Sequence, residues 1–95
     1  MERLHIVIDE DLDPIYGCVQ GAHATAQFML DNQDQTWNNS YLIFLKSNLN
    51  KITNRLRLKN IDYTCFNEPD LDDRLTAIAV LGNERVFKDL KLIGK

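Results

Sequence analysis

Apolar residues in this 95-residue chain occur in short runs that are separated by polar or acidic stretches. Four of these runs are five to seven residues long and predict strands. The predicted strands are Leu4–Ile8, Tyr41–Lys46, Ile61–Phe66 and Leu75–Leu81. The second, Y-L-I-F-L-K, has apolar residues on both faces, so we expect it to lie inside the sheet.

Helical signals lie between the predicted strands. Asp13-Pro14 predicts the start of a first helix, because an N-cap carboxylate precedes proline at the first helical position. This helix should end near Leu30. A second helix is expected from Leu49 to Lys59, with Ser47 or Asn48 as its cap. Its apolar residues have the i, i+3, i+7 spacing of a buried stripe; they are Leu49, Ile52 and Leu56.

The last predicted elements complete the order β-α-β-α-β-β-α. Asn60 suits the end of the second helix, and Asn83 is expected to cap a short third helix. Strand–helix–strand units favour parallel pairing, whereas the loop between the last two strands is too short for a helical crossover. The sequence therefore predicts one α/β domain over residues 1–95, with three layers and a mixed four-stranded sheet flanked by helices.

The first predicted helix carries two neighbouring stripes. The apolar stripe is expected to face the core and consists of Ile15, Val19, Ala22, Ala26 and Met29. The polar stripe lies about 80–140° round the helix from Ile15. It is placed for the wall of a cleft and consists of Tyr16, Gln20, His23 and Gln27. Gly17 and Gly21 each cost about 1 kcal/mol relative to alanine, which indicates a packing or functional reason for them.

Several of these side chains are candidates for chemistry. His23 is placed to act as a general base or to orient water; the alternative is a helix histidine that does neither. Glu68-Pro69-Asp70-Leu71 offers a carboxylate before a strand, and Thr76 a hydroxyl at that strand's start. A solvated acidic turn and an ordinary strand threonine are the alternatives. His5, between apolar strand neighbours, is expected to be structural.

Charge is distributed unevenly around the net value of −3. Residues 1–34 hold one arginine and seven acids, whereas residues 46–60 hold five basic residues and no acid. An acidic total argues against broad coating of nucleic acid. Even so, Lys51, Arg55 and Lys59, spaced i, i+4, i+8, predict a row that could contact a few phosphates. The solvated face of an amphipathic helix is the alternative.

Composition excludes several classes of protein. No apolar run approaches the roughly 18–20 residues that a bilayer span needs, and no charged-then-apolar leader is present. We therefore expect a soluble, cytoplasmic protein that does not bind membranes. Cys18 and Cys65 lack metal-binding spacing and are expected to be buried, reduced thiols. Nucleotide-binding and zinc-hydrolase motifs are missing, so neither a cofactor nor a metal is expected.

Three segments, in order, resemble the class II peptidyl-tRNA hydrolase family. They are V-Q-G-A-H-A at 19–24, Y-L-I-F-L at 41–45, and N-E-P-D-L…L-T-A-I-A-V within 67–80. The likeness extends from about Leu4 to Gly82. It implies an α/β fold with a four-stranded mixed sheet. The implied activity is hydrolysis of the ester between a stalled peptide and the tRNA 3′ end, without a metal or cofactor.

The resemblance also implies roles for five residues of this chain. The family's helix glutamine and histidine match Gln20 and His23, its acidic loop residue matches Asp70, and its final-strand threonine matches Thr76. Tyr16 stands where the family carries lysine. His23 would activate water while Asp70 holds its other ring nitrogen, and Thr76, Gln20 or Tyr16 would donate to the oxyanion. A neutral tyrosine makes weaker hydrogen bonds than a charged lysine.

Three functional hypotheses follow from the sequence. The first is a divergent peptidyl-tRNA hydrolase with peptidyl-tRNA as its partner. The second is a catalytically silent relative that binds tRNA or a protein through the same fold. The third is a domain whose cleft now holds another small ligand. Because members of the family often form dimers, a homodimer is a further expectation.

Overall fold

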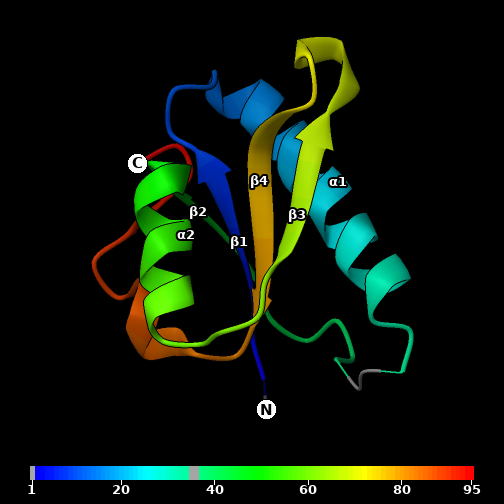
Figure 1. Cartoon of the computed structure of the whole chain (residues 1–95), viewed down its shortest axis with the longest axis vertical. Helices are drawn as coiled ribbons and strands as arrows, with labels where there is room; N and C mark the ends of the chain where they lie inside the picture. Colours follow the sequence, from blue (N-terminus) through cyan, green and yellow to red (C-terminus); the bar gives the residue numbers. More distant parts are fainter. Residues whose placement is uncertain (1, 35–36) are drawn as a thin grey trace.

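A mixed five-stranded sheet carries one helix on each face (Figure 1). The computed structural model describes residues 2–34 and 37–95. The strands are β1 (Leu4–Asp9), β2 (Leu42–Ser47), β3 (Thr64–Glu68), β4 (Arg74–Leu81) and β5 (Lys91–Leu92). The helices are α1 (Pro14–Asp31) and α2 (Leu49–Leu58), and two short 3-10 turns are η1 (Pro69–Leu71) and η2 (Glu84–Phe87).

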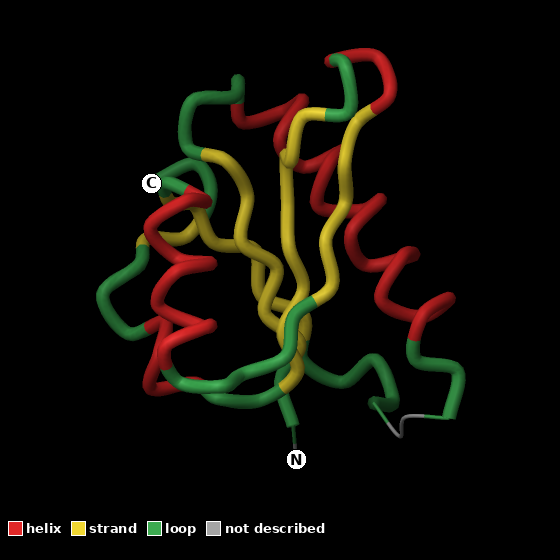
Figure 2. Tube along the Cα trace, viewed as in Figure 1, coloured by secondary structure: helices red, strands yellow, loops and turns green. Residues whose placement is uncertain are grey.

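The strand order is β3-β4-β1-β2-β5, with β1 at the centre (Figure 2). β1 and β2 are parallel and are connected through α1, and the other three pairings are antiparallel. This confirms the predicted mixed sheet and the helical crossover between the first two strands. β3 and β4, which are joined by a loop without a helical crossover, pair antiparallel. The number of strands was predicted wrongly, because β5 adds a fifth.

The C-terminal segment differs most from the prediction. Instead of a third helix it forms the four-residue turn η2 and then β5, which pairs with β2. Asn83 adopts a left-handed backbone conformation and its side chain binds Leu81 O, so it makes no cap for η2. Phe87 is buried in the core, and the chain then returns to pair with the otherwise open edge of β2.

The sheet separates two apolar cores. On the α2 face the central residues are Val7, Leu45, Leu49, Ile52, Leu56, Ile78, Val80 and Phe87. On the α1 face they are Leu4, Ile6, Ile8, Ala24, Phe28, Ala77 and Ala79. The predicted buried stripe of α2 is confirmed, and Asn60 ends that helix in the left-handed conformation. His5 also lies in the interior, stacked on Phe87, and burial lowers its pKa.

The predicted orientation of α1 is wrong. Ile15, Val19 and Met29 were expected in the core, but they are exposed. The residues of α1 that are buried are Gly17, Gln20, Gly21, Ala24 and Phe28. The reason is space, because Ile8 and Phe44 already fill the sheet surface beneath the helix. A Cβ on Gly21 would come within 2.8 Å of the Phe44 ring and 2.9 Å of Ile8 Cδ1. Only a small-residue face fits there.

Smaller differences concern cysteines, loops and strand ends. Cys65 is exposed and Cys18 is half-buried, so the expectation of two buried thiols is wrong; both are free. The third strand begins at Thr64 rather than Ile61. The polar segment 31–40 is typical of a loop, and its residues Gln35 and Thr36 lie outside the described residues. Within the described ranges, no helix has the length and apolar character needed to cross a bilayer.

Candidate functional site

A chain of hydrogen bonds joins α1 to β3 and β4. The Thr76 hydroxyl donates to Gln20 Oε1 over 2.6 Å, and Gln20 Nε2 donates to Glu68 Oε1 over 3.0 Å. Gln20 and Thr76 are 0% exposed. Because each amide atom of Gln20 has its own partner, the orientation of the side chain is fixed. Residues far apart in sequence are thereby held in one polar cluster.

Glu68 is the centre of this cluster. Its Oε1 accepts from Gln20 and, over 3.5 Å, from the Tyr16 hydroxyl, while its Oε2 accepts from the Asp70 backbone N–H over 3.3 Å. The hydrogen bond from Gln20 is the main reason why the pKa of Glu68 lies below its usual value, and the backbone N–H adds to the effect. Glu68 is therefore an ionised acceptor at neutral pH.

Tyr16 stands at the open end of the cluster, where it is half-buried. Desolvation is the first cause of the raised pKa of Tyr16, and the charges of Glu68 and Asp70 add to it. Its phenol is thus neutral and can donate a hydrogen bond. The 3.5 Å distance to Glu68 is at the outer limit for a hydrogen bond, so little holds this donor against a competing acceptor.

His23 lies one turn along α1 from Gln20 and is exposed. Its ring stacks on Phe66 of β3, with centroids 4.6 Å apart and planes inclined by 8°. His23 also contributes electrostatically to the lowered pKa of Glu68, so the two groups are within range of each other. Stacking fixes the plane of the imidazole while leaving the ring accessible to solvent.

The carboxylate that the cluster uses is that of Glu68, whereas the sequence favoured Asp70. Asp70 is exposed, and no hydrogen bond joins it to His23 among the described residues. The sequence feature that could have identified Glu68 is the alternation of buried and exposed residues along its strand. Thr64, Phe66 and Glu68 alternate with the exposed Cys65 and Asn67, which puts Glu68 on the α1 side of the sheet. Of the five predicted residues, Gln20, Thr76 and Tyr16 are joined through hydrogen bonds; His23 and Asp70 flank them.

A small cavity lies at the carboxyl ends of β1 and β2. It has a volume of about 280 Å³, and the residues that line it include Asp9, Asn48 and Arg74. The Arg74 guanidinium forms an ion pair with Asp9, and its backbone is paired with Glu68. Because α1 and α2 leave these adjacent parallel strands toward opposite faces, this is a position where open α/β sheets commonly bind ligands.

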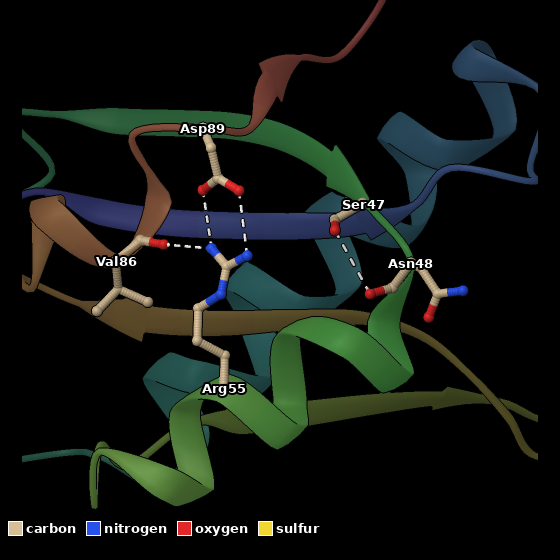
Figure 3. Close-up of polar contacts among 5 residues, drawn as sticks. All are labelled: Ser47, Asn48, Arg55, Val86 and Asp89. Atoms are coloured by element: carbon tan, nitrogen blue, oxygen red, sulfur yellow. Dashed lines mark hydrogen bonds and ion pairs between the residues drawn. The ribbon is translucent and has the colours of Figure 1, made fainter.

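The predicted basic row on α2 is only partly available. Arg55 turns toward the C-terminal segment, where its Nη1 donates to Val86 O over 2.9 Å and both terminal nitrogens bind the Asp89 carboxylate (Figure 3). This pairing lowers the pKa of Asp89 and raises that of Arg55. Lys51 and Lys59 are exposed. Arg55 therefore serves first to hold η2 and the following loop against α2.

Comparison with known proteins identifies the fold alone. No family model and no curated protein matches the sequence. Among solved structures, a protein of unknown function from Agrobacterium tumefaciens strain C58, Atu0240, has a similar structure, with a TM-score of 0.67. The two share 12% sequence identity, and the match covers 96% of each chain. This similarity covers the whole domain and carries no information about activity.

Proposed function

We propose that the protein hydrolyses the ester of peptidyl-tRNA, with His23 as general base. The hydrogen-bonded cluster carries this proposal, because three of the residues that the family resemblance singles out belong to it: Tyr16 and Gln20 donate to Glu68, and Thr76 donates to Gln20. The exposed His23 beside them can take a proton from water. Asp70 lies at the rim, next to Tyr16, where its charge acts on the phenol.

The roles of the buried residues follow from their partners. Thr76 is fully buried behind Gln20, so it positions that amide rather than contacting substrate. Glu68 accepts three hydrogen bonds, which makes it a poor base and a good anchor for Tyr16 and Gln20. The Tyr16 hydroxyl, loosely held, is the donor available to a developing oxyanion.

An ester-release assay with an N-acetylated aminoacyl-tRNA tests the proposal. His23→Ala should lower turnover by about 10²–10⁴-fold, the usual contribution of a general base. Gln27→Ala is the matched control, because Gln27 lies on the same helix one turn further along and binds only Asp31 in the described structure. Absence of turnover at high enzyme concentration would contradict the proposal. Tyr16→Lys should raise turnover if the missing cation limits the rate.

A second candidate function is binding of tRNA without hydrolysis. The exposed Lys51, Arg57 and Lys59 favour binding of a polyanion. The charge of the site argues against hydrolysis, since Glu68 and Asp70 are carboxylates and no basic side chain is hydrogen-bonded to the cluster in the described residues. An oxyanion would be poorly stabilised beside them. Retained tRNA affinity together with no ester release would support this function over the first.

A further inference from the structure

His5 is an ionisable side chain enclosed in the core on the α2 face of the sheet. It is 3% exposed. Its Nδ1 is the one buried side-chain nitrogen or oxygen among the described residues that has no hydrogen-bond partner. Its ring stacks on Phe87 of η2, with centroids 4.6 Å apart and planes inclined by 26°. Such surroundings accept a neutral imidazole, whereas a charged one is disfavoured because it loses its water.

The charges around His5 do not compensate for its burial. Burial has the largest effect on the pKa of His5 and lowers it, and the positive charge of Arg3 adds to this effect. The carboxylate of Glu84 and the backbone carbonyls of Val80 and Gly82 act in the opposite direction. Because the net shift of the pKa is downward, the enclosed imidazole is neutral at pH 7. A proton on the ring favours any arrangement in which water reaches it.

Phe87 belongs to a C-terminal segment, residues 84–95, that is attached to the rest of the domain at a few separate points. Arg55 of α2 binds a backbone carbonyl of η2 and the Asp89 carboxylate, and these two opposite charges neutralise each other (Figure 3). β5 pairs with β2 over two residues only, and Ile93 N donates to a carbonyl of β2 over 3.0 Å. An element with so few contacts can open without unfolding of the whole domain.

We propose that His5 is a pH switch that releases residues 84–95 from the domain under mildly acidic conditions. When the imidazole takes up a proton, Phe87 leaves the core and water reaches the ring. The segment then detaches from α2 and β2, which uncovers the edge of β2 that β5 occupies. The chain turns just before this segment, at Gly82 and Asn83, which both have left-handed backbone conformations. The switch does not depend on the proposed hydrolase activity.

The release has a defined pH range. In the open form the His5 ring is solvated and titrates near the ordinary value of 6.5. The closed form binds the proton more weakly, so acidification favours the open form. The equilibrium constant for opening should rise by up to about tenfold for each pH unit below 6.5, until the lowered pKa is reached. Above 6.5 this constant should not change, because the ring is neutral in both forms.

Hydrogen exchange of the Ile93 amide, measured by NMR from about pH 5 to about pH 7.5, tests the switch. The observed rate is divided by that of an unstructured amide at the same pH, which gives the protection of Ile93. This protection should be constant above pH 6.5 and should fall by up to about tenfold for each unit below it. It should also be smaller than the protection of the β1 amides at every pH. Asp89 stays ionised in this range, because its pKa is lowered by Arg55.

Variants assign the effect to His5. The chain has two histidines, so His23→Gln is the matched control and should keep the wild-type pH profile. His5→Phe retains a ring against Phe87 and should make the protection of Ile93 independent of pH. Arg55→Ala leaves His5 in place and removes the contacts to η2 and Asp89, so it should lower the protection of Ile93 by about tenfold at every pH with the same slope.

Two results would overturn the switch. Protection of Ile93 in the wild-type protein that does not change with pH would show that the segment opens without exposing His5. Equal protection of Ile93 and of the β1 amides would show that residues 84–95 are released only when the whole domain unfolds. Both measurements use the wild-type chain and do not require that any variant folds.

Discussion

The hydroxyl of Thr76 is the most closely held polar group of the candidate site, 2.6 Å from Gln20 Oε1 in a fully buried position. Thr76→Val keeps the shape of the side chain but removes the hydroxyl. Gln20 Oε1 would then be buried without the hydrogen bond from residue 76. We expect a loss of about 1–3 kcal/mol in the free energy of unfolding, measured by urea denaturation. Thr76→Ser retains the hydroxyl and serves as the control. Equal stability of Thr76→Val and wild type would show that Gln20 needs no partner there.

Glu68 gives the site a defined pH dependence. Because hydrogen bonds lower its pKa in the folded state, its stabilising effect is present above the ordinary value of 4.5 and is lost as the pH falls through the lowered value. Glu68→Gln lacks this titration. The difference in urea midpoint between wild type and Glu68→Gln should therefore be largest near neutral pH and shrink as the pH falls below 4.5. A difference that does not change with pH would exclude this role for the Glu68 charge.

At the scale of the element, Gly21 sets how closely α1 approaches the sheet. Gly21→Ala gains about 1 kcal/mol of helix propensity, but its Cβ would contact Phe44 and the fully buried Ile8 at less than 3.0 Å. Overpacking of this kind costs about 1–3 kcal/mol, so we expect net destabilisation in thermal or urea unfolding. Gly17→Ala is the matched comparison, since its nearest contact is longer, at 3.0 Å. If Gly21→Ala were the more stable of the two, α1 would not be limited by this contact.

How far an element can be predicted from its sequence differs along this chain. Four strands and two helices follow from apolar runs and from caps such as Asp13 and Asn48, because these are local signals. The orientation of α1 cannot be predicted in this way, because both of its faces are free of charge. It is determined by the bulk of Ile8 and Phe44, against which only the small-residue face of the helix fits. β5 was missed because two residues carry no periodicity and pair only where β2 offers an open edge.

The same limit applies to the candidate site. The polar stripe of α1 was recognised, and three of the predicted residues meet in one cluster: Tyr16, Gln20 and Thr76. The structure separates that stripe by burial, with Gln20 inside and His23 exposed. Which carboxylate joins the cluster, that of Glu68 or that of Asp70, depends on where β3 ends and how it pairs with β4. The sequence alone does not determine this pairing.

At the scale of the whole molecule, the two helices differ in charge. Residues 14–30 of α1 include no Asp, Glu, Lys or Arg, whereas α2, on the other face of the sheet, has three basic residues and no acid (Figure 1). Lys51 lies in the first turn of α2, which follows the carboxyl end of β2. Glu68 is the last residue of β3, at the same end of the sheet. A tRNA bound to α2 through its phosphates would therefore have to pass over this end of the sheet to bring its 3′ end to the cluster around Glu68.

The exposed basic residues on and next to α2 predict how tRNA affinity should depend on salt concentration. Because Arg55 is paired with Asp89, the exposed basic residues of α2 and its C-cap are Lys51, Arg57 and Lys59, enough for about three phosphate contacts. The logarithm of tRNA affinity should then fall with the logarithm of salt concentration with a slope of about −2 to −3. Lys51→Ala should reduce the magnitude of that slope by about one unit. Arg3→Ala should leave the slope unchanged, because Arg3 directly precedes β1, at the opposite end of the sheet. Fluorescence anisotropy of labelled tRNA across a salt series measures both slopes. An identical slope for Lys51→Ala and wild type would place the phosphate contacts elsewhere and remove α2 from the binding surface.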